Sequence, residues 1–153
     1  YQGSYYEWTE ATTNNNPTGQ PLISPYYFDW DRMNQTYQFK STLEKGYGYW
    51  FFAFQPGIFW IEEQNVTTDN TITTVSPGWN LISTPYNNAV YKNEILINDT
   101  EWGTAVSNGW INEYVFGWNR TNQNYEFSET FEPGKSYWLF ATQVCNLKIN
   151  PSS

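Results

Sequence analysis

Side chains that commonly act as catalysts are scarce in this chain. It has no His and a single Cys, Cys145, so a Ser nucleophile has no imidazole base and a Cys/His zinc site cannot form. A paired-carboxylate hydrolase is the remaining option, but no Asp or Glu pair lies in an apolar stretch that would raise its pKa. We therefore expect no enzyme activity, no catalytic residue and no cofactor. Cys145 is expected to be a small buried hydrophobe or, alternatively, to bond another chain.

Oxygen ligands for a metal ion come closest together at Asp29, Asp31 and Asn34. Carboxylates and amides at such spacing could hold Ca²⁺. The second half of the chain has Gly117 and Asn119 at the positions equivalent to the two carboxylates, and no 12-residue calcium loop is present. A solvated turn is the better interpretation, and we expect no metal site.

Four Asn-x-Ser/Thr sequons are candidate glycosylation sites. Each falls in a predicted turn or linker, where an attached glycan is tolerated. They begin at Asn34, Asn65, Asn98 and Asn119.

The charge pattern excludes two classes of partner. The formal net charge is −8, and the seven basic residues are scattered along the chain. No basic face can be built from them, so we expect no nucleic-acid binding and no attraction to an anionic membrane. No run of about 20 apolar residues is present, so we expect no membrane span in this segment.

An internal repeat defines the elements that must position any site. Residues 28–61 align without a gap on residues 116–149, and sixteen of the 34 positions are identical. Upstream, the string WTEA at residues 8–11 matches WGTA at residues 102–105. We therefore divide the chain into repeat 1, residues 1–66, and repeat 2, residues 67–153.

Repeat 2 has an opening segment, TITTVSPGWNLISTP at residues 71–85, whose equivalent in repeat 1 would precede Tyr1. We therefore expect the chain to be a mature product or a segment of a longer chain, with repeat 1 lacking its opening strand. A sheet without that strand exposes main-chain N–H and C=O groups along one edge, which is a template for strand pairing.

The predicted fold is mainly β (a minor α+β component), with two tandem antiparallel units, each a small barrel or sandwich with one short helix. In repeat 2 we expect a helix over residues 100–108 and strands over residues 79–83, 110–118, 125–130, 135–142 and 144–149. The strand at residues 47–54 is apolar on both faces, so both should be covered, by repeat 2 or by another molecule.

The aromatic residues, 21% of the chain, fall into two groups. Those that recur in both repeats, such as Phe39 and Phe52, are expected in the core. The recurring W-x-R pairs, Trp30 with Arg32 and Trp118 with Arg120, are expected to be structural hairpin pairs with the guanidinium on the indole, or alternatively a ligand clamp. Aromatic residues that mostly do not recur are interface candidates, with local core and a sugar platform as alternatives; they are Tyr5, Tyr6, Phe54, Phe59, Trp60 and Trp110.

The strings PGWNLIS, WGTAVSNG, YVFGWNRTNQNYEF, FEPGKSYWLF and CNLKI together resemble a tandem repeat of archaeal cell-surface and S-layer-like proteins. The resemblance covers residues 71–149 and about residues 5–62. It implies an extracellular, arrayed β domain with no catalytic residues. Two departures are the absence of PGWNLIS from repeat 1 and Gly57 in place of Cys145.

Three functions fit these observations. The first is a structural subunit of an extracellular filament, sheath or S-layer, assembling with copies of itself through strand edges and aromatic contacts. The second is a carbohydrate-binding or adhesin module that contacts surface glycans. The third is a pair of repeats within a large surface protein, without a separate activity. All three place the protein outside the cell or at its surface.

Overall fold

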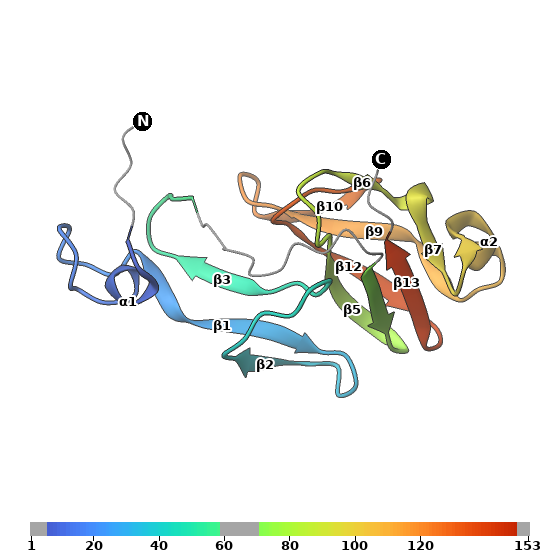
Figure 1. The fold of residues 1–153 in the computed structure, drawn as a ribbon, viewed down its shortest axis with the longest axis horizontal. Coiled ribbons are helices and arrows are strands. Elements are labelled where there is room, and N and C mark those ends of the chain that lie inside the picture. The colour runs from blue at the N-terminus through green and yellow to red at the C-terminus, as the bar shows by residue number, and fades with distance from the viewer. Residues whose placement is uncertain (1–5, 59–70, 150–153) are drawn as a thin grey trace.

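The computed structural model describes residues 6–58 and 71–149 and shows a mainly antiparallel β protein (Figure 1). Strands make up 48% of it and helices 10%, which confirms the predicted fold class, and no described sheet closes into a barrel. Each repeat has one short α-helix, as predicted: α1 (Trp8–Ala11) in repeat 1 and α2 (Trp102–Ser107) in repeat 2. None of the described helices is long and apolar enough to cross a membrane.

Repeat 2 is built from two four-stranded sheets and a small ribbon. The first sheet has the order β10-β9-β12-β5, from Asn124–Ser128, Ile111–Asn119, Ser136–Ala141 and Gly78–Ser83. The second has the order β4-β13-β7-β8, from Thr71–Val75, Cys145–Ile149, Ile95–Ile97 and Thr100–Glu101. The ribbon pairs β11 (Thr130–Phe131) with β6 (Val90–Tyr91), and the 3-10 helix η1 (Lys92–Glu94) follows.

The hydrophobic core lies between these two sheets. Burial alternates along β12 and β13, because successive side chains of a strand point to opposite faces. Leu139 and Leu147 are fully buried there, and Trp102 of α2 is 4% exposed. Cys145 is 1% exposed and is free, which confirms the expectation of a small buried hydrophobe. Its burial raises the pKa of its thiol.

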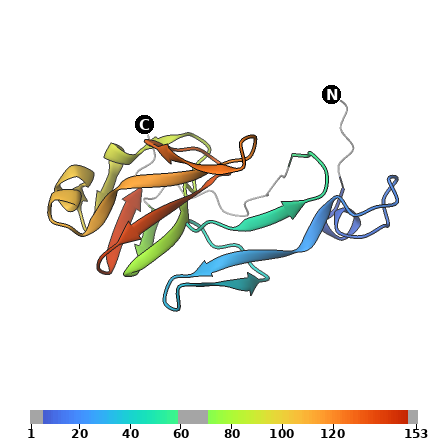
Figure 2. The ribbon, with the colours of Figure 1, turned by 180° about the vertical axis from the view of Figure 1, so that it is seen from behind.

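Repeat 1 is a single three-stranded sheet in the described residues, with the order β2-β1-β3 (Figures 1 and 2). Its strands are β1 (Ile23–Asp31), β2 (Thr36–Lys40) and β3 (Trp50–Ala53). No apolar side chain of the described part of repeat 1 is buried. Among the residues described here, two packed sheets are therefore found in repeat 2 and a single sheet in repeat 1.

The strand predicted over residues 47–54 is shorter than expected, because the segment at its start contacts repeat 2 instead. Gly48 N donates to Leu81 O at 3.0 Å, and Ser83 N donates to Gly46 O at 3.0 Å. Gly46 has φ +81°, and a Cβ there would collide with the Thr73 side chain, so glycine is required. Residues 46–48 thus run along the outer edge of β5.

Candidate functional site

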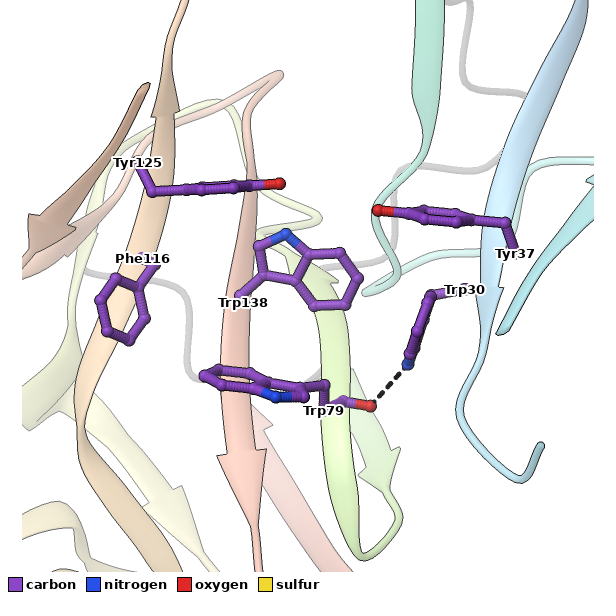
Figure 3. Close-up of a pocket in the computed structure, with 6 residues that line it drawn as sticks. All are labelled: Trp30, Tyr37, Trp79, Phe116, Tyr125 and Trp138. Carbon is purple, nitrogen blue, oxygen red and sulfur yellow. Dashed lines mark hydrogen bonds between the residues drawn. The ribbon is translucent and has the colours of Figure 1, made fainter. Parts of the chain in front are cut away.

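The outer edge of β5 is held by side chains of repeat 1. Trp79 N donates to Gln35 Oε1 at 2.7 Å, and Gln35 Nε2 donates to Trp79 O at 3.0 Å. Trp30 Nε1 donates to the same Trp79 O at 2.7 Å (Figure 3). The side-chain amide of Gln35 therefore pairs with the Trp79 main chain as a neighbouring strand would.

The turn between β1 and β2 fixes the position of Gln35. Asp31 Oδ1 accepts from Met33 N at 2.9 Å and from Asn34 N at 3.1 Å, and Gln35 takes a left-handed φ of +53°. Gln35 Nε2 also donates to Arg32 O at 2.8 Å. The side-chain hydrogen bond from Asn34, followed by its main-chain bond, lowers the pKa of Asp31. Asp31 thus organises a turn, and no described cluster of His, Cys, Asp and Glu is arranged to hold a metal ion.

The equivalent turn of repeat 2 has the same geometry, but it bonds no strand of the other repeat among the described residues. Asn119 Oδ1 accepts from Thr121 N and Asn122 N at 2.9 and 3.0 Å. Gln123 has φ +53°, and its Nε2 donates to Arg120 O at 2.7 Å, as Gln35 does in repeat 1. Within the described residues, Gln123 Oε1 accepts no hydrogen bond. Repeat 2 therefore presents an unoccupied copy of the group that holds Trp79.

The two repeats meet through reciprocal pairs of tryptophans. The ring centroids of Trp30 and Trp138 are 5.1 Å apart and the planes are at 87°. The exchanged pair, Trp50 and Trp118, is 5.6 Å apart at 74°. Because each member of one pair is the repeat equivalent of a member of the other, the interface has approximate two-fold symmetry.

An aromatic cleft of about 470 Å³ opens beside these pairs (Figure 3). Tyr37 of β2 and Tyr125 of β10 direct their hydroxyls toward each other across Trp138. Burial, with a further contribution from Tyr125, raises the pKa of Tyr37. The side chains that line the cleft are all aromatic; they are Trp30, Tyr37, Trp79, Phe116, Tyr125 and Trp138.

One edge of β3 is unpaired in the part of the chain that the structure describes. In repeat 2 the equivalent strand, β12, pairs with β9 on one side and with β5 on the other. In repeat 1, β3 pairs with β1, and no described residue forms a strand on its other side. Ala53 at this edge is exposed, whereas its equivalent Ala141 is fully buried. The position taken by β5 in repeat 2 is therefore unfilled by the described part of the chain.

The inner face of the repeat 1 sheet is covered by no second sheet of residues 6–58 and 71–149. A groove of about 450 Å³ lies on it, lined by Trp8, Pro25, Tyr27, Lys40, Ser41, Leu43 and Phe51. Trp8 is 37% exposed and Leu43 is 40% exposed, whereas their equivalents in repeat 2, Trp102 and Phe131, are 4% and 1% exposed. Positions that form the core of repeat 2 thus face a groove in repeat 1.

The recurring W-x-R pairs do not form the predicted stack. Arg32 follows the last residue of β1, and its Cζ lies 4.4 Å from the centroid of the Tyr47 ring instead of over Trp30. Arg120 is exposed, and no stack with Trp118 is present in the described structure. The prediction was wrong because it placed Arg32 on the strand, whereas the chain turns after Asp31.

The six interface candidates lie in different environments. Tyr5, Phe59 and Trp60 lie outside the described residues. Trp110 is half-buried against the core of repeat 2, so it is a core residue and not a free interface residue. Tyr6 is half-buried, and Phe54 is 56% exposed with its ring 5.3 Å from that of Phe52.

Three of the recurring aromatics expected in the core are exposed. Tyr37 is 47% exposed, Phe39 is 68% exposed and Phe52 is 64% exposed, so the expectation of a core position was wrong for these three. They lie on the face of the repeat 1 sheet on which Trp30 and Trp50 meet repeat 2.

Three of the four sequons can be placed, and Asn65 lies outside the described residues. Asn34 and Asn98 are exposed, as expected for turns. Asn119 is half-buried, and its Nδ2 donates to Glu126 Oε1 at 2.9 Å. Asn34 Nδ2 likewise donates to Asp31 Oδ2 at 2.7 Å, so a glycan on Asn34 or Asn119 would compete with an existing bond, and Asn98 is the most accessible of the three positions.

The residues that sequence reasoning missed are Gln35, Gln123 and Trp79. Gln35 and Gln123 recur in the repeat, and this signal was available. The fold is that of a sandwich-like β protein. In this site the Gln35 side chain bonds the main chain at the outer edge of β5. Comparison of the chain with protein-family models, with curated proteins and with solved structures gives no match.

Proposed function

We propose that this chain is a structural subunit of an extracellular filament, sheath or S-layer-like array. In this proposal neighbouring copies assemble by adding a strand to the open edge of β3 and through aromatic contacts. The observation that carries it is the difference between the two sheets, which have three strands in repeat 1 and four in repeat 2. A sheet edge with unpaired N–H and C=O groups is a template for another strand.

The apolar face beneath that edge supports the same proposal. Phe51 and Tyr27 stack at 5.1 Å in the groove of repeat 1, whereas their equivalents Leu139 and Val115 are buried under a second sheet. Covering this face would remove apolar surface from water at about 25 cal/mol per Å². An added strand would therefore gain both main-chain hydrogen bonds and hydrophobic contact.

Exposed aromatic side chains on the outer faces give a second type of contact. Tyr26 is 63% exposed and Phe127 is 68% exposed, in addition to Phe39 and Phe52. Contiguous exposed apolar surface is typical of interaction sites. The resemblance to archaeal cell-surface repeats and the scarcity of basic residues support an extracellular location.

The proposal is tested by placing a charge at the open edge. Ala53 is exposed in the free chain, so Ala53→Lys should leave its circular dichroism and unfolding midpoint unchanged. In an occupied sheet residue 53 would be buried as Ala141 is, and an unpaired Lys there blocks pairing.

The assay is sedimentation together with negative-stain electron microscopy of the native particle. We expect wild type and the control Asn87→Lys, which adds the same charge at an exposed position of repeat 2, to assemble equally. Ala53→Lys should remain in the supernatant. Normal assembly of Ala53→Lys would remove the open edge from the mechanism.

The aromatic cleft favours a second candidate, a carbohydrate-binding or adhesin module. Aromatic faces stack on sugar rings, and the hydroxyls of Tyr37 and Tyr125 supply hydrogen bonds at its mouth. A glycan array probed with wild type and with Tyr125→Ala tests it. Binding that Tyr125→Ala abolishes would favour this candidate, and an absence of glycan binding would leave assembly as the function.

A further inference from the structure

We infer that the aromatic cleft between the two repeats binds a small soluble cation with a quaternary ammonium group, which the faces of the aromatic rings hold. The cleft of about 470 Å³ is lined by residues of both repeats. This inference goes beyond the proposed assembly and does not depend on it, because none of the six residues that line the cleft belongs to β3.

The lining can attract a cation although none of its six side chains is ionised at neutral pH. All six are aromatic, and three of them are tryptophans. The face of an aromatic ring carries negative partial charge, and tryptophan binds cations best. The chain already holds one cation in this way outside the cleft, because Arg32 Cζ lies 4.4 Å from the ring centroid of Tyr47. The formal net charge of −8 adds a long-range attraction for cations.

The rings of the cleft meet at nearly right angles, as the walls of a box do. The plane of Trp138 makes angles of 87° with Trp30, 84° with Trp79 and 77° with Tyr37, at centroid distances of 5.1, 6.4 and 6.4 Å. Figure 3 shows Tyr37 and Tyr125 on one side of the Trp138 ring and Trp79 on the opposite side. A group in the cleft therefore meets aromatic rings from several directions, which suits a compact, nearly spherical cation.

The small number of hydrogen-bonding groups in the lining favours a quaternary ammonium group over a primary ammonium or a sugar. Trp30 Nε1 already donates to Trp79 O at 2.7 Å. The other polar side-chain groups of the lining are the hydroxyls of Tyr37 and Tyr125 and the indole N–H groups of Trp79 and Trp138. A polar group that leaves water without finding a partner loses free energy. A quaternary ammonium group has no N–H, so it gives up no hydrogen bond when it enters the cleft.

Contacts between the two repeats hold the rings in place without a ligand. Gln35 bonds Trp79 N and O at 2.7 and 3.0 Å, and the Trp30 indole bonds the same carbonyl. The ring of Trp79 also packs on that of Phe116, with the centroids 6.0 Å apart. A site whose side chains are already fixed loses less conformational entropy when a ligand binds. The cleft is therefore preorganised for binding.

The first test compares choline with its neutral isostere 3,3-dimethylbutan-1-ol, in which carbon replaces the charged nitrogen. Each compound is titrated into the full chain at an ionic strength held constant with NaCl, and the indole N–H signals of Trp30, Trp79 and Trp138 are followed by NMR. We expect saturable shifts with choline and a dissociation constant about tenfold higher or more for the isostere, because it lacks the charge. Equal dissociation constants, or no saturable shift with choline, would overturn the inference.

Substitutions of Tyr125 separate the role of a ring face from that of a hydroxyl. Tyr125 is 47% exposed, so replacing it should leave the fold intact, which the remaining NMR signals check. Tyr125→Leu should raise the dissociation constant of choline about fivefold, whereas Tyr125→Phe, which keeps the ring, should change it by less than about threefold. The control Tyr91→Leu, at an exposed tyrosine of repeat 2 outside the cleft, should bind as wild type does. An equal loss in Tyr125→Phe and Tyr125→Leu would overturn binding by the ring faces.

Two further experiments distinguish a soluble ammonium ion from a lipid headgroup and from a sugar. Phosphatidylcholine carries the same ammonium group beside a phosphate, which the acidic chain repels, so the chain should not sediment with vesicles of pure phosphatidylcholine. Sedimentation with these vesicles would overturn the assignment to a soluble ion. Binding on the glycan array without any choline shift would assign the cleft to the carbohydrate candidate and would also overturn the inference.

Discussion

Equivalent residues of the two repeats should differ sharply in their effect on stability. Leu139 and Phe51 occupy the same position of the repeat, but Leu139 is fully buried and Phe51 lies in the groove of repeat 1. Truncating a fully buried Leu to Ala costs about 2–5 kcal/mol, from lost burial and the cavity left behind. We expect Leu139→Ala to lower the free energy of unfolding by that amount.

Phe51→Ala should cost much less in the free chain. Its ring stacks on Tyr27 at 5.1 Å and meets the edge of Trp8 at 6.3 Å, but one side of it faces the groove. Aromatic pairs contribute about 0.5–1.5 kcal/mol each beyond burial, and a half-buried ring gains only part of the burial term. We therefore expect a loss of about 1–2 kcal/mol.

Urea unfolding followed by tryptophan fluorescence and circular dichroism measures both values. With a slope of about 2 kcal/mol per M, the urea midpoint should fall by about 1–2.5 M for Leu139→Ala and by about 0.5–1 M for Phe51→Ala. In the assembled particle Phe51→Ala should become the more costly change, because an added strand would bury residue 51. Equal losses for the two variants in the free chain would show that repeat 1 has a complete core of its own and refute this reasoning.

Two further predictions follow from the turns. Gln35→Ala removes both hydrogen bonds of the Gln35 side chain to the Trp79 main chain and should lower the free energy of unfolding by about 1–3 kcal/mol, measured by urea denaturation. A change within error would mean that residues 46–48 and the Trp30 indole hold β5 without Gln35. The hydrogen bonds from Asn34 lower the folded pKa of Asp31, so the stability they contribute is present above the unfolded pKa and is lost as pH falls through the folded value. Amide chemical shifts of Met33 and Asn34 should therefore change in acid, and Asp31→Asn should remove that change; shifts that still move with pH in the variant would contradict the assignment.

Much of the fold of repeat 2 could be predicted from the sequence. Its hairpins alternate in hydrophobicity and its turns carry Gly, Pro and Asn, so β5, β9 and β12 fall within about two residues of their expected ends. The helix α2 begins two residues later than expected, because Thr100 belongs to β8 and Glu101 is the N-cap. The local sequence pattern predicted whether a segment is a helix or a strand, but it did not predict the residues at which each element begins and ends.

The site was harder to predict, because a residue can recur in both repeats for two reasons: it contacts the other repeat, or it packs within its own sheet. Trp30 and Trp118 recur because each contacts the other repeat, whereas Tyr49 and Tyr137 recur within their own sheets. Sequence identity between repeats cannot separate these cases. Gln35 looked like an ordinary turn residue, and only the approach of β5 gives its amide a partner.

The difference between the two edges also bears on the geometry of any assembly. Residues 46–48 and Gln35 cover the outer edge of β5. The described sheets also end at β2 and β10, but these equivalent strands are outer strands in both repeats, whereas β3 is an outer strand although its equivalent β12 is not. If the added strand comes from another surface of the neighbouring copy, the contact builds an open, polar polymer unless its rotation closes a ring, and every subunit of a filament points the same way. Pairing of two β3 strands would instead give a two-fold contact, and a native particle in which subunits alternate in direction would contradict the polar arrangement.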